Sequence, residues 1–292
     1  MKTLKILFSM LALSIITACG GGGGATVQGS ISGTATKGPV SNATMTAYAI
    51  SNGQIGAQIA TATSDANGNF TMTTGGYAGP VMLQMSGGTY IDEAKGTNMS
   101  MATGDVMTAV MPTVAAGANV TGIQVTPVTS MAQTRAQAMA GGMTDANITA
   151  ANTAMGNYFT VSDILHIRPM NPLVAGSGIA VGITQDMKNY GLTIAAMSQS
   201  AKTLTMTVSS AFVTAMMSDA SDGFMDGKMG ATPISMSMSG MMGTGMMATT
   251  AGTSSLATAM TNFMNSNANV SGLTATNMDV LIQKMTISNG QI

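Results

Sequence analysis

The chain reads Val81-Met82-Leu83-Gln84-Met85 in its first half, so that Val81, Leu83 and Met85 fall at every second position. Residues 44–49 alternate in the same way: Thr44, Thr46 and Tyr48 are interleaved with Met45, Ala47 and Ala49. Because successive side chains of a strand point to opposite faces of a sheet, a period of two residues predicts β-strands. The pattern continues from about residue 27 to residue 125, so we expect a β-domain over residues 27–126.

Turn signals separate the predicted strands. They are Lys37-Gly38-Pro39, Ser51-Asn52-Gly53, Asp65-Ala66-Asn67-Gly68-Asn69, Gly75-Gly76 and Gly87-Gly88. Glycine, proline and asparagine supply the backbone conformations that tight turns need. Several short strands at this spacing predict an antiparallel β-sandwich.

The apolar period becomes helical after residue 127, and Pro127 stands at the change. Four apolar faces at helical spacing are Val128, Met131, Ala132 and Met139; Met187, Tyr190, Ile194, Met197 and Ala201; Leu204, Val208, Ala211, Phe212 and Ala215; and Met278, Leu281, Ile282 and Met285. Such faces predict bundle-like helices over residues 127–292. The fold class is therefore α+β, and we expect residues 25–126 to fold alone.

Two further helices are predicted from their capping residues. Thr144 or Asp145 is expected to cap a helix that runs to about residue 157, and Ser254 or Ser255 one that runs to about residue 265.

Two segments of the predicted β-domain share a further pattern. They are residues 33–43, Gly33-Thr34-Ala35-Thr36-Lys37-Gly38-Pro39-Val40-Ser41-Asn42-Ala43, and residues 63–70, Thr63-Ser64-Asp65-Ala66-Asn67-Gly68-Asn69-Phe70. Together they resemble the carboxypeptidase-regulatory-like, or transthyretin-like, sandwich of bacterial surface proteins. The resemblance implies that the Gly-Pro-Val segment leads into a strand and that the Asp-Ala-Asn-Gly turn ends on a buried Phe70. Such modules mostly serve as spacers or binding platforms, so this fold implies no activity.

The N-terminus has the pattern of an export leader. Lys2 and Lys5 precede an apolar run over residues 6–16, which is too short to span a bilayer. Ile16-Thr17-Ala18-Cys19 follows, and Cys19 is the single cysteine of the chain. Residues 20–24 are all glycine, which makes a flexible tether.

This leader resembles the lipobox of bacterial lipoproteins. The resemblance implies a signal peptide over residues 1–18, acylation of Cys19 with chains such as palmitate, and a tether over residues 19–26. It also implies a membrane-anchored protein of the cell envelope, placed in the outer membrane of a Gram-negative host because Gly20 stands where aspartate would retain it. The alternative is an ordinary secretory leader that is cut elsewhere.

Composition excludes some classes of function. Charged residues make up 7% of the chain, with 10 basic and 11 acidic residues, so no basic patch is available to bind nucleic acid. A lipidated Cys19 leaves no cysteine for a disulfide or a thiolate site.

Methionine is unusually frequent, with 32 residues in the chain. Most stand where a strand or helix favours leucine, and the flexible thioether fills such places adequately. Six crowd instead into a predicted Gly/Ser loop at residues 233–253, where we expect no apolar face for them to serve: Met236, Met238, Met241, Met242, Met246 and Met247. Thioethers select Cu(I), so this loop is a candidate soft-metal site; compositional drift, a sink for oxidants or a poorly packed loop are the alternatives.

An acidic loop follows one of the predicted helices. It contains Asp219, Asp222 and Asp226 together with two turn-forming glycines, and three carboxylates of this kind could hold calcium. Phe224 sits where an EF-hand needs a ligand and no glutamate closes the loop, so a solvated turn is the alternative.

Enzymatic signatures are weak. His166 has no cysteine and no Gly-x-Ser-x-Gly elbow that it could activate as a nucleophile. Asp92-Glu93 is predicted to be a solvated strand end, with the two side chains on opposite faces. We therefore expect no enzyme, no cofactor and no nucleic-acid partner. The predicted function is a cell-envelope lipoprotein that acts as a structural or interaction module, with a metal-binding envelope protein as the alternative. Its partner is not indicated.

Overall fold

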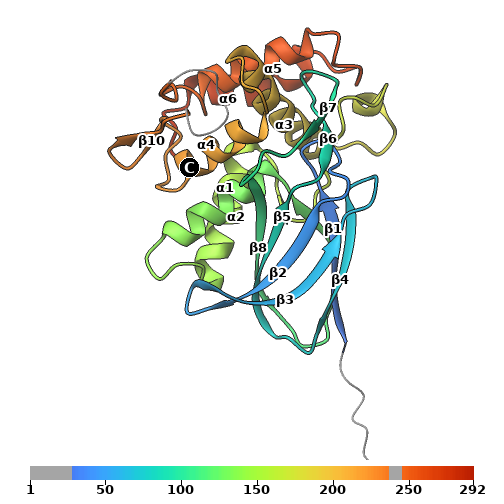
Figure 1. The fold of residues 1–292 in the computed structure, drawn as a ribbon. Helices are drawn as coiled ribbons and strands as arrows, with labels where there is room; N and C mark the ends of the chain where they lie inside the picture. The colour runs from blue at the N-terminus through green and yellow to red at the C-terminus, as the bar shows by residue number, and fades with distance from the viewer. Residues whose placement is uncertain (1–27, 237–244) are drawn as a thin grey trace, which may run out of the picture.

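The computed structural model describes residues 28–236 and 245–292, which form strands first and helices second (Figure 1). The strands are β1 (Gly29–Ala35), β2 (Thr44–Ser51), β3 (Gln54–Thr63), β4 (Asn69–Gly75), β5 (Gly79–Ser86), β6 (Thr89–Ile91), β7 (Asn98–Ser100), β8 (Val106–Val114), β9 (Asn119–Val125), β10 (Lys228–Met229) and β11 (Thr232–Pro233). The helices are α1 (Pro127–Ala138), α2 (Asp145–Phe159), α3 (Gln185–Thr203), α4 (Ser210–Ala220), α5 (Ser254–Met264) and α6 (Asp279–Ile287). The predicted α+β class is confirmed.

The strands of the N-terminal region form two main sheets. One has the order β3-β2-β5-β8 and is antiparallel throughout; the other has the order β4-β1-β9. In the second sheet β1 pairs antiparallel with β4 but parallel with β9, so the expectation of a wholly antiparallel arrangement is wrong at this edge. The reason is that β8 and β9 lie in different sheets, so the short turn between them does not impose hairpin pairing.

Both faces of the four-stranded sheet are buried along β5 and β8, whereas the edge strand β3 is largely exposed. Val81, Leu83 and Met85 belong to one large apolar cluster with residues of β1, β4 and β9. On the other face Met82 and Val110 pack in a second cluster with Ala136, Ile148 and Ala151 of α1 and α2. Because alternate side chains of β5 and β8 serve different neighbours, this sheet is the middle layer between the other sheet and two helices.

Helix α1 begins where the period of the sequence changes. Thr126 accepts the backbone N–H of Thr129 at 3.2 Å and Pro127 occupies the first helical position, which satisfies the helix start. The hydroxyl of Ser130 accepts the N–H of Thr108 in β8 at 2.8 Å, which ties the helix to the sheet.

The other helices match the predictions unevenly. Thr144 caps α2 as predicted. Helix α5 follows Thr253, one residue before the predicted cap. The predicted face from Leu204 to Ala215 is wrong at its start, because Thr205 adopts a positive φ of 55° after α3 and α4 begins only at Ser210.

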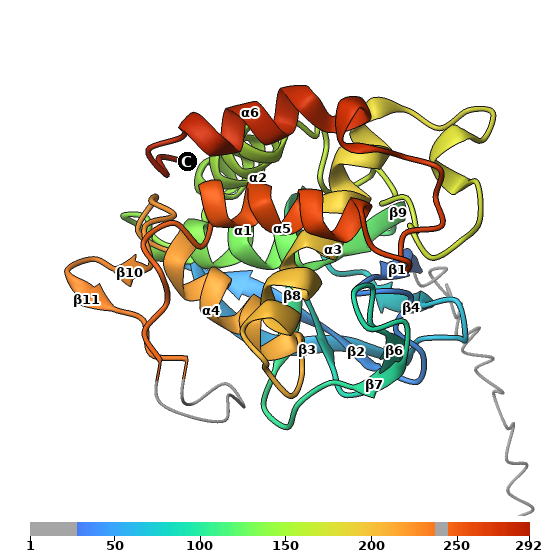
Figure 2. The same ribbon diagram turned by 90° about the horizontal axis from the view of Figure 1, so that it is seen from above.

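Helices α3, α5 and α6 lie in succession, each beside the next (Figure 2). The large apolar cluster runs from Ile31 in β1 to Met285 in α6, so sheets and helices share one core in the described part of the chain. Independent folding of residues 25–126 stays a prediction, and this continuous core opposes it. Within the described ranges no helix is long and apolar enough to cross a membrane.

Candidate functional site

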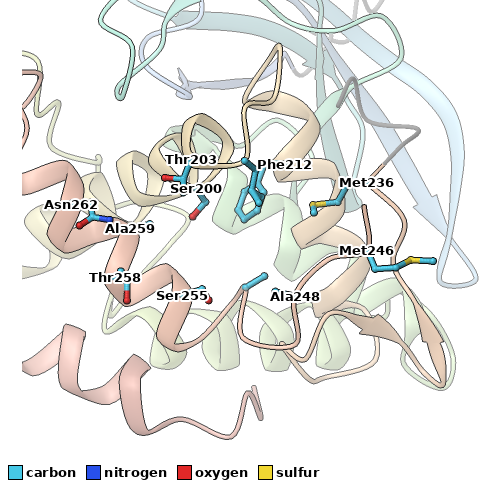
Figure 3. A pocket seen from close by; sticks show the side chains of 12 residues that line it. Ser200, Thr203, Phe212, Met236, Met246, Ala248, Ser255, Thr258, Ala259 and Asn262 are labelled. Atoms are coloured by element: carbon cyan, nitrogen blue, oxygen red, sulfur yellow. The ribbon is translucent and has the colours of Figure 1, made fainter. Parts of the chain in front are cut away.

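A cavity of about 300 Å³ opens between α3, α4 and α5 (Figure 3). The polar lining residues come from α3 and α5. The apolar ones include Phe212 and described residues of the Met-rich loop. The lining residues are Ser200, Thr203, Leu204, Phe212, Met236, Met246, Ala248, Ala251, Ser255, Thr258, Ala259 and Asn262. None of these side chains is charged, so the cavity suits a neutral group with an apolar part and a hydrogen-bonding part.

The described residues of the Met-rich loop have order that the sequence did not predict. The backbone N–H of Met236 donates to Gly245, and that of Met247 donates to Ile234, so the chain returns on itself as a short ladder. Met236 and Met247 are 2% and 4% exposed and belong to the large apolar cluster. The expectation that these methionines have no apolar face to serve is therefore wrong for both, because the ladder directs them into the core.

Met246 is the exception, since 65% of its surface is exposed at the rim of the cavity (Figure 3). Met238, Met241 and Met242 lie outside the described residues. The structure thus places two of the six methionines in the core and one at the surface, and the soft-metal hypothesis stays a prediction.

The carboxylates of the acidic loop accept hydrogen bonds from backbone N–H groups of the same loop and of the hairpin that follows it. Oδ1 of Asp219 accepts the N–H groups of Asp226, Gly227 and Lys228 at 3.0, 2.6 and 3.2 Å. Asp222 accepts from Phe224 at 3.0 Å and from Gly230 at 2.5 Å. These bonds define a turn between α4 and the β10–β11 hairpin, as the alternative to a calcium site predicts, but Asp219 is buried and so the turn is not solvated at this residue.

No group of three or more histidine, cysteine, aspartate or glutamate side chains is placed to hold a metal ion in residues 28–236 and 245–292. Asp226 also lies 4.0 Å from the ammonium of Lys228, which competes for the same carboxylate. The calcium hypothesis is not carried further.

Asp219 has an unusual environment for a carboxylate. It is fully buried, and its Oδ2 has no hydrogen-bond partner among the described residues. Burial raises the pKa of Asp219 to about 7, although the three N–H donors on Oδ1 act in the opposite direction. The side chain therefore binds its proton far more tightly than an exposed aspartate.

The structure overturns the prediction for Asp92-Glu93. Strand β6 ends at Ile91, and both carboxylates are buried, with 0% and 2% of their surfaces exposed. They are not a solvated strand end, because the β6–β7 hairpin projects against α3 and α4 and each acid finds a partner there.

Glu93 pairs with Lys37, which is also fully buried. The ammonium of Lys37 lies 2.8 Å from Oε2 of Glu93 and donates a second hydrogen bond to Ser198 of α3. Ser198 donates to the same Oε2 at 2.6 Å. Lys37 Nζ also lies 5.3 Å from the centre of the Tyr90 ring, which favours a cation.

Asp92 serves the neighbouring helix. Its Oδ2 accepts the hydroxyl of Ser209, just before α4, and Ser209 contacts the hydroxyl of Tyr90 at 3.0 Å. Burial by itself lowers the pKa of Lys37, but the carboxylates of Glu93 and Asp92 outweigh burial and raise it above its ordinary value. Lys37 therefore rests as the ammonium ion in the folded protein.

Sequence reasoning missed this buried polar cluster, which consists of Lys37, Tyr90, Asp92, Glu93, Ser198 and Ser209. Lys37 stands in a turn motif and Asp92-Glu93 beside a strand, so each reads as a surface feature. The available signal was compositional: adjacent acids and a lysine are conspicuous in a chain with 7% charged residues.

A second cavity, of about 370 Å³, reaches this cluster. Glu93 lines it together with Gly38, Met170 and Gly191, while Arg168 stands at its edge. It places a buried carboxylate next to a solvent-connected space.

His166 lies apart from both cavities. Its Nδ1 is 2.8 Å from Oδ2 of Asp163, and both side chains are half exposed. In the described part of the chain no nucleophile is paired with His166. Its contact with Asp163 is a local one, at the surface of a single turn.

A scan against protein-family models finds no match to this chain, and searches of curated proteins and of solved structures find none either. The two resemblances drawn above therefore rest on the quoted residues. Cys19 and the glycine tether lie outside the described residues.

Proposed function

We propose that this protein is a lipid-anchored component of a bacterial cell envelope that acts as a structural or interaction module and not as an enzyme. The observation that carries the proposal is the leader that ends at Cys19 and is followed by five glycines. The two sheets would then be the sandwich that the transthyretin-like resemblance implies, with its edge modified by the parallel β1–β9 pair.

The arrangement of the ends supports this proposal. Strand β1 begins at the foot of the sheets, whereas α5 and α6 lie at the opposite end of the molecule (Figure 1). A lipid attached to Cys19 would hold the foot of the sheets near the membrane and the helices away from it. The uncharged cavity between α3, α4 and α5 would then face outward, where a partner can reach it.

The test is replacement of the acylated residue. Cys19→Ser should abolish incorporation of a palmitate analogue and leave the precursor uncut, with its apolar leader still attached. Ser9→Ala in the same leader keeps the cysteine and should behave like the native chain. Processing of Cys19→Ser at the native bond would contradict the proposal.

Placement in the outer membrane needs a separate variant. Gly20→Asp should retain the lipoprotein in the inner membrane of a Gram-negative host, with acylation unchanged. Equal distribution of Gly20→Asp and native protein between the two membranes would remove the outer-membrane assignment and leave the anchor itself intact.

A soft-metal function is the second proposal, because Met236 and Met246 line one cavity on paired segments of backbone. Thioethers there could bind Cu(I) or Ag(I). In an Ag(I) titration followed by methionine methyl NMR, the Met236 and Met246 signals should shift. Met82, which lies in the separate cluster against α1 and α2, is the control and should not shift. Shifts that are equal or absent at all three residues would exclude the site.

A further inference from the structure

The Lys37–Glu93 pair has a feature that ordinary surface ion pairs lack, namely nearly complete exclusion from solvent. The two side chains are 0% and 3% exposed, with 2.8 Å between Nζ and Oε2. Removing two charges from water is costly, and their mutual attraction repays that cost only in favourable geometry.

Backbone packing brings the two groups together. Gly38 has a φ of +61°, and a Cβ at this position would lie 2.4 Å from the carbonyl oxygen of Ile91. The turn that carries Lys37 is thus pressed against the end of β6, two residues before Glu93. Only glycine allows this approach, so the backbone itself positions the amine at the carboxyl group.

Asp92 is not the partner of this amine. Its Oδ1 accepts the N–H groups of Ala94 and Lys95 at 3.0 and 2.9 Å, and its Oδ2 accepts from Ser209. Glu93 Oε2, in contrast, contacts both Lys37 Nζ and the Ser198 hydroxyl. The carboxyl carbon next to the amine is therefore Cδ of Glu93.

We propose that Lys37 and Glu93 condense into an intramolecular isopeptide bond. A proton first passes from the ammonium to Oε2 along their hydrogen bond, which leaves a neutral amine beside a neutral acid. The lone pair of Nζ then forms the bond to Cδ, and the bond from Cδ to Oε2 breaks. Oε2 leaves as one water with two protons from the original ammonium, so no oxidant or other reactant is needed.

Burial favours this reaction in two ways. Burial by itself lowers the pKa of Lys37 and so reduces the cost of the proton transfer, whereas the carboxylates of Glu93 and Asp92 act in the opposite direction. Two groups held in contact also react with an effective concentration of roughly 10⁵–10⁸ M in well-oriented cases, which offsets the competition from bulk water. The Ser198 hydrogen bond to Oε2 stabilises the departing oxygen.

The surroundings provide an exit for the released water. Glu93 lines the cavity of about 370 Å³ that opens between the Lys37 turn and α3. The product amide would remain enclosed on its other side by Tyr90 and Ser198. It would link positions 37 and 93, which are 56 residues apart, and so restrict the unfolded chain as a disulfide does, in a protein that has no cysteine available for one.

The test is tryptic digestion of the fully denatured whole chain, prepared as Cys19→Ser so that lipid adds no mass. Trypsin should cut after Lys95 but not after Lys37, whose amine is consumed. The expected product is one peptide that runs through Lys37 to Lys95, lighter than its sequence by about 18 Da, the mass of one water. Fragmentation should place the link between Lys37 and Glu93.

Lys37→Arg is the matched control, because arginine keeps the positive charge but cannot form this amide. Its digest should contain the separate peptide of residues 38–95 at unmodified mass. The proposal is overturned if the chain with native Lys37 also yields this peptide in full amount, or if the uncut peptide has its unmodified mass. Cleavage after Lys95 in every sample shows that digestion is complete, so neither result depends on how well a variant folds.

Discussion

Asp219 shows how one buried atom changes the chemistry of a common residue. Its Oδ1 accepts three N–H groups of the turn after α4, while Oδ2 is buried with no partner in residues 28–236 and 245–292. A charge on this carboxylate is costly, so the folded protein favours the protonated acid. The sequence showed three acids in one loop; the enclosure of just one of them is a tertiary effect.

We predict that the free energy of unfolding falls as the pH rises through this group's range. The pKa of Asp219 is about 7 in the folded protein and 3.8 in the reference state, so between these values the folded state holds a proton that the unfolded state has lost. The contribution of Asp219 to the free energy of unfolding is largest below pH 4. It decreases between pH 4 and pH 7 by roughly 4 kcal/mol at most, and it stays constant above that range.

Urea unfolding of the native chain and of Asp219→Asn at pH 4.5 and pH 8 measures this effect. The asparagine variant keeps an acceptor for the three N–H groups but has no proton to lose. The free energy of unfolding of the variant minus that of the native chain should therefore be larger at pH 8 than at pH 4.5. A pH-independent difference between the two chains would show that Asp219 titrates normally.

At the scale of single elements, the capping residue of a helix can be exposed or can itself be part of the buried interior. Thr144 caps α2 from an exposed position, where its hydroxyl accepts the N–H of Asn147 at 3.2 Å. Thr126 caps α1 from a buried position and also contacts the hydroxyl of Tyr190 at 2.7 Å. The same residue type at the same helical position thus has different tertiary roles.

Thr126→Ala should therefore destabilise the protein more than Thr144→Ala. Loss of an exposed cap costs about 1 kcal/mol. The buried site loses its cap together with the hydrogen bond to Tyr190, so about 2–3 kcal/mol is expected there. Chemical denaturation of both variants makes the comparison, and equal losses would mean that the Tyr190 contact contributes nothing.

For the whole molecule, the decisive feature is the middle position of the β3-β2-β5-β8 sheet. One of its faces is covered by α1 and α2, and the β6–β7 hairpin buries Asp92 and Glu93 against α3 and α4. Removing the helices would expose an apolar face, uncover the buried Lys37–Glu93 pair, and take the hydroxyls of Ser198 and Ser209 from the two carboxylates.

A fragment of residues 28–126 should accordingly fail to unfold cooperatively, and it should bind a hydrophobic dye. The expected circular dichroism melt is broad, whereas the fragment of residues 28–292 should give one sharp transition. A sharp transition for the short fragment would instead support the independent β-domain that the sequence pattern predicts.

The period of the apolar residues determined the order of strands before helices, the change at Pro127 and most of the turns, because these depend on neighbours along the chain. Phe70, for example, is buried directly after its predicted turn. The leader and Cys19 also form a local signal in the sequence, and lipidation of Cys19 stays a prediction.

Tertiary structure alone decided the parallel β1–β9 pair, the burial of Met236 and Met247, and the meeting of Lys37 with Glu93 and Ser198. These depend on contacts between residues distant in sequence, such as the 161 positions from Lys37 to Ser198. A lysine in a turn and an acid after a strand each favour solvent on their own. They are buried here because strands and helices pack around them, and the two charges come into contact only in the folded structure.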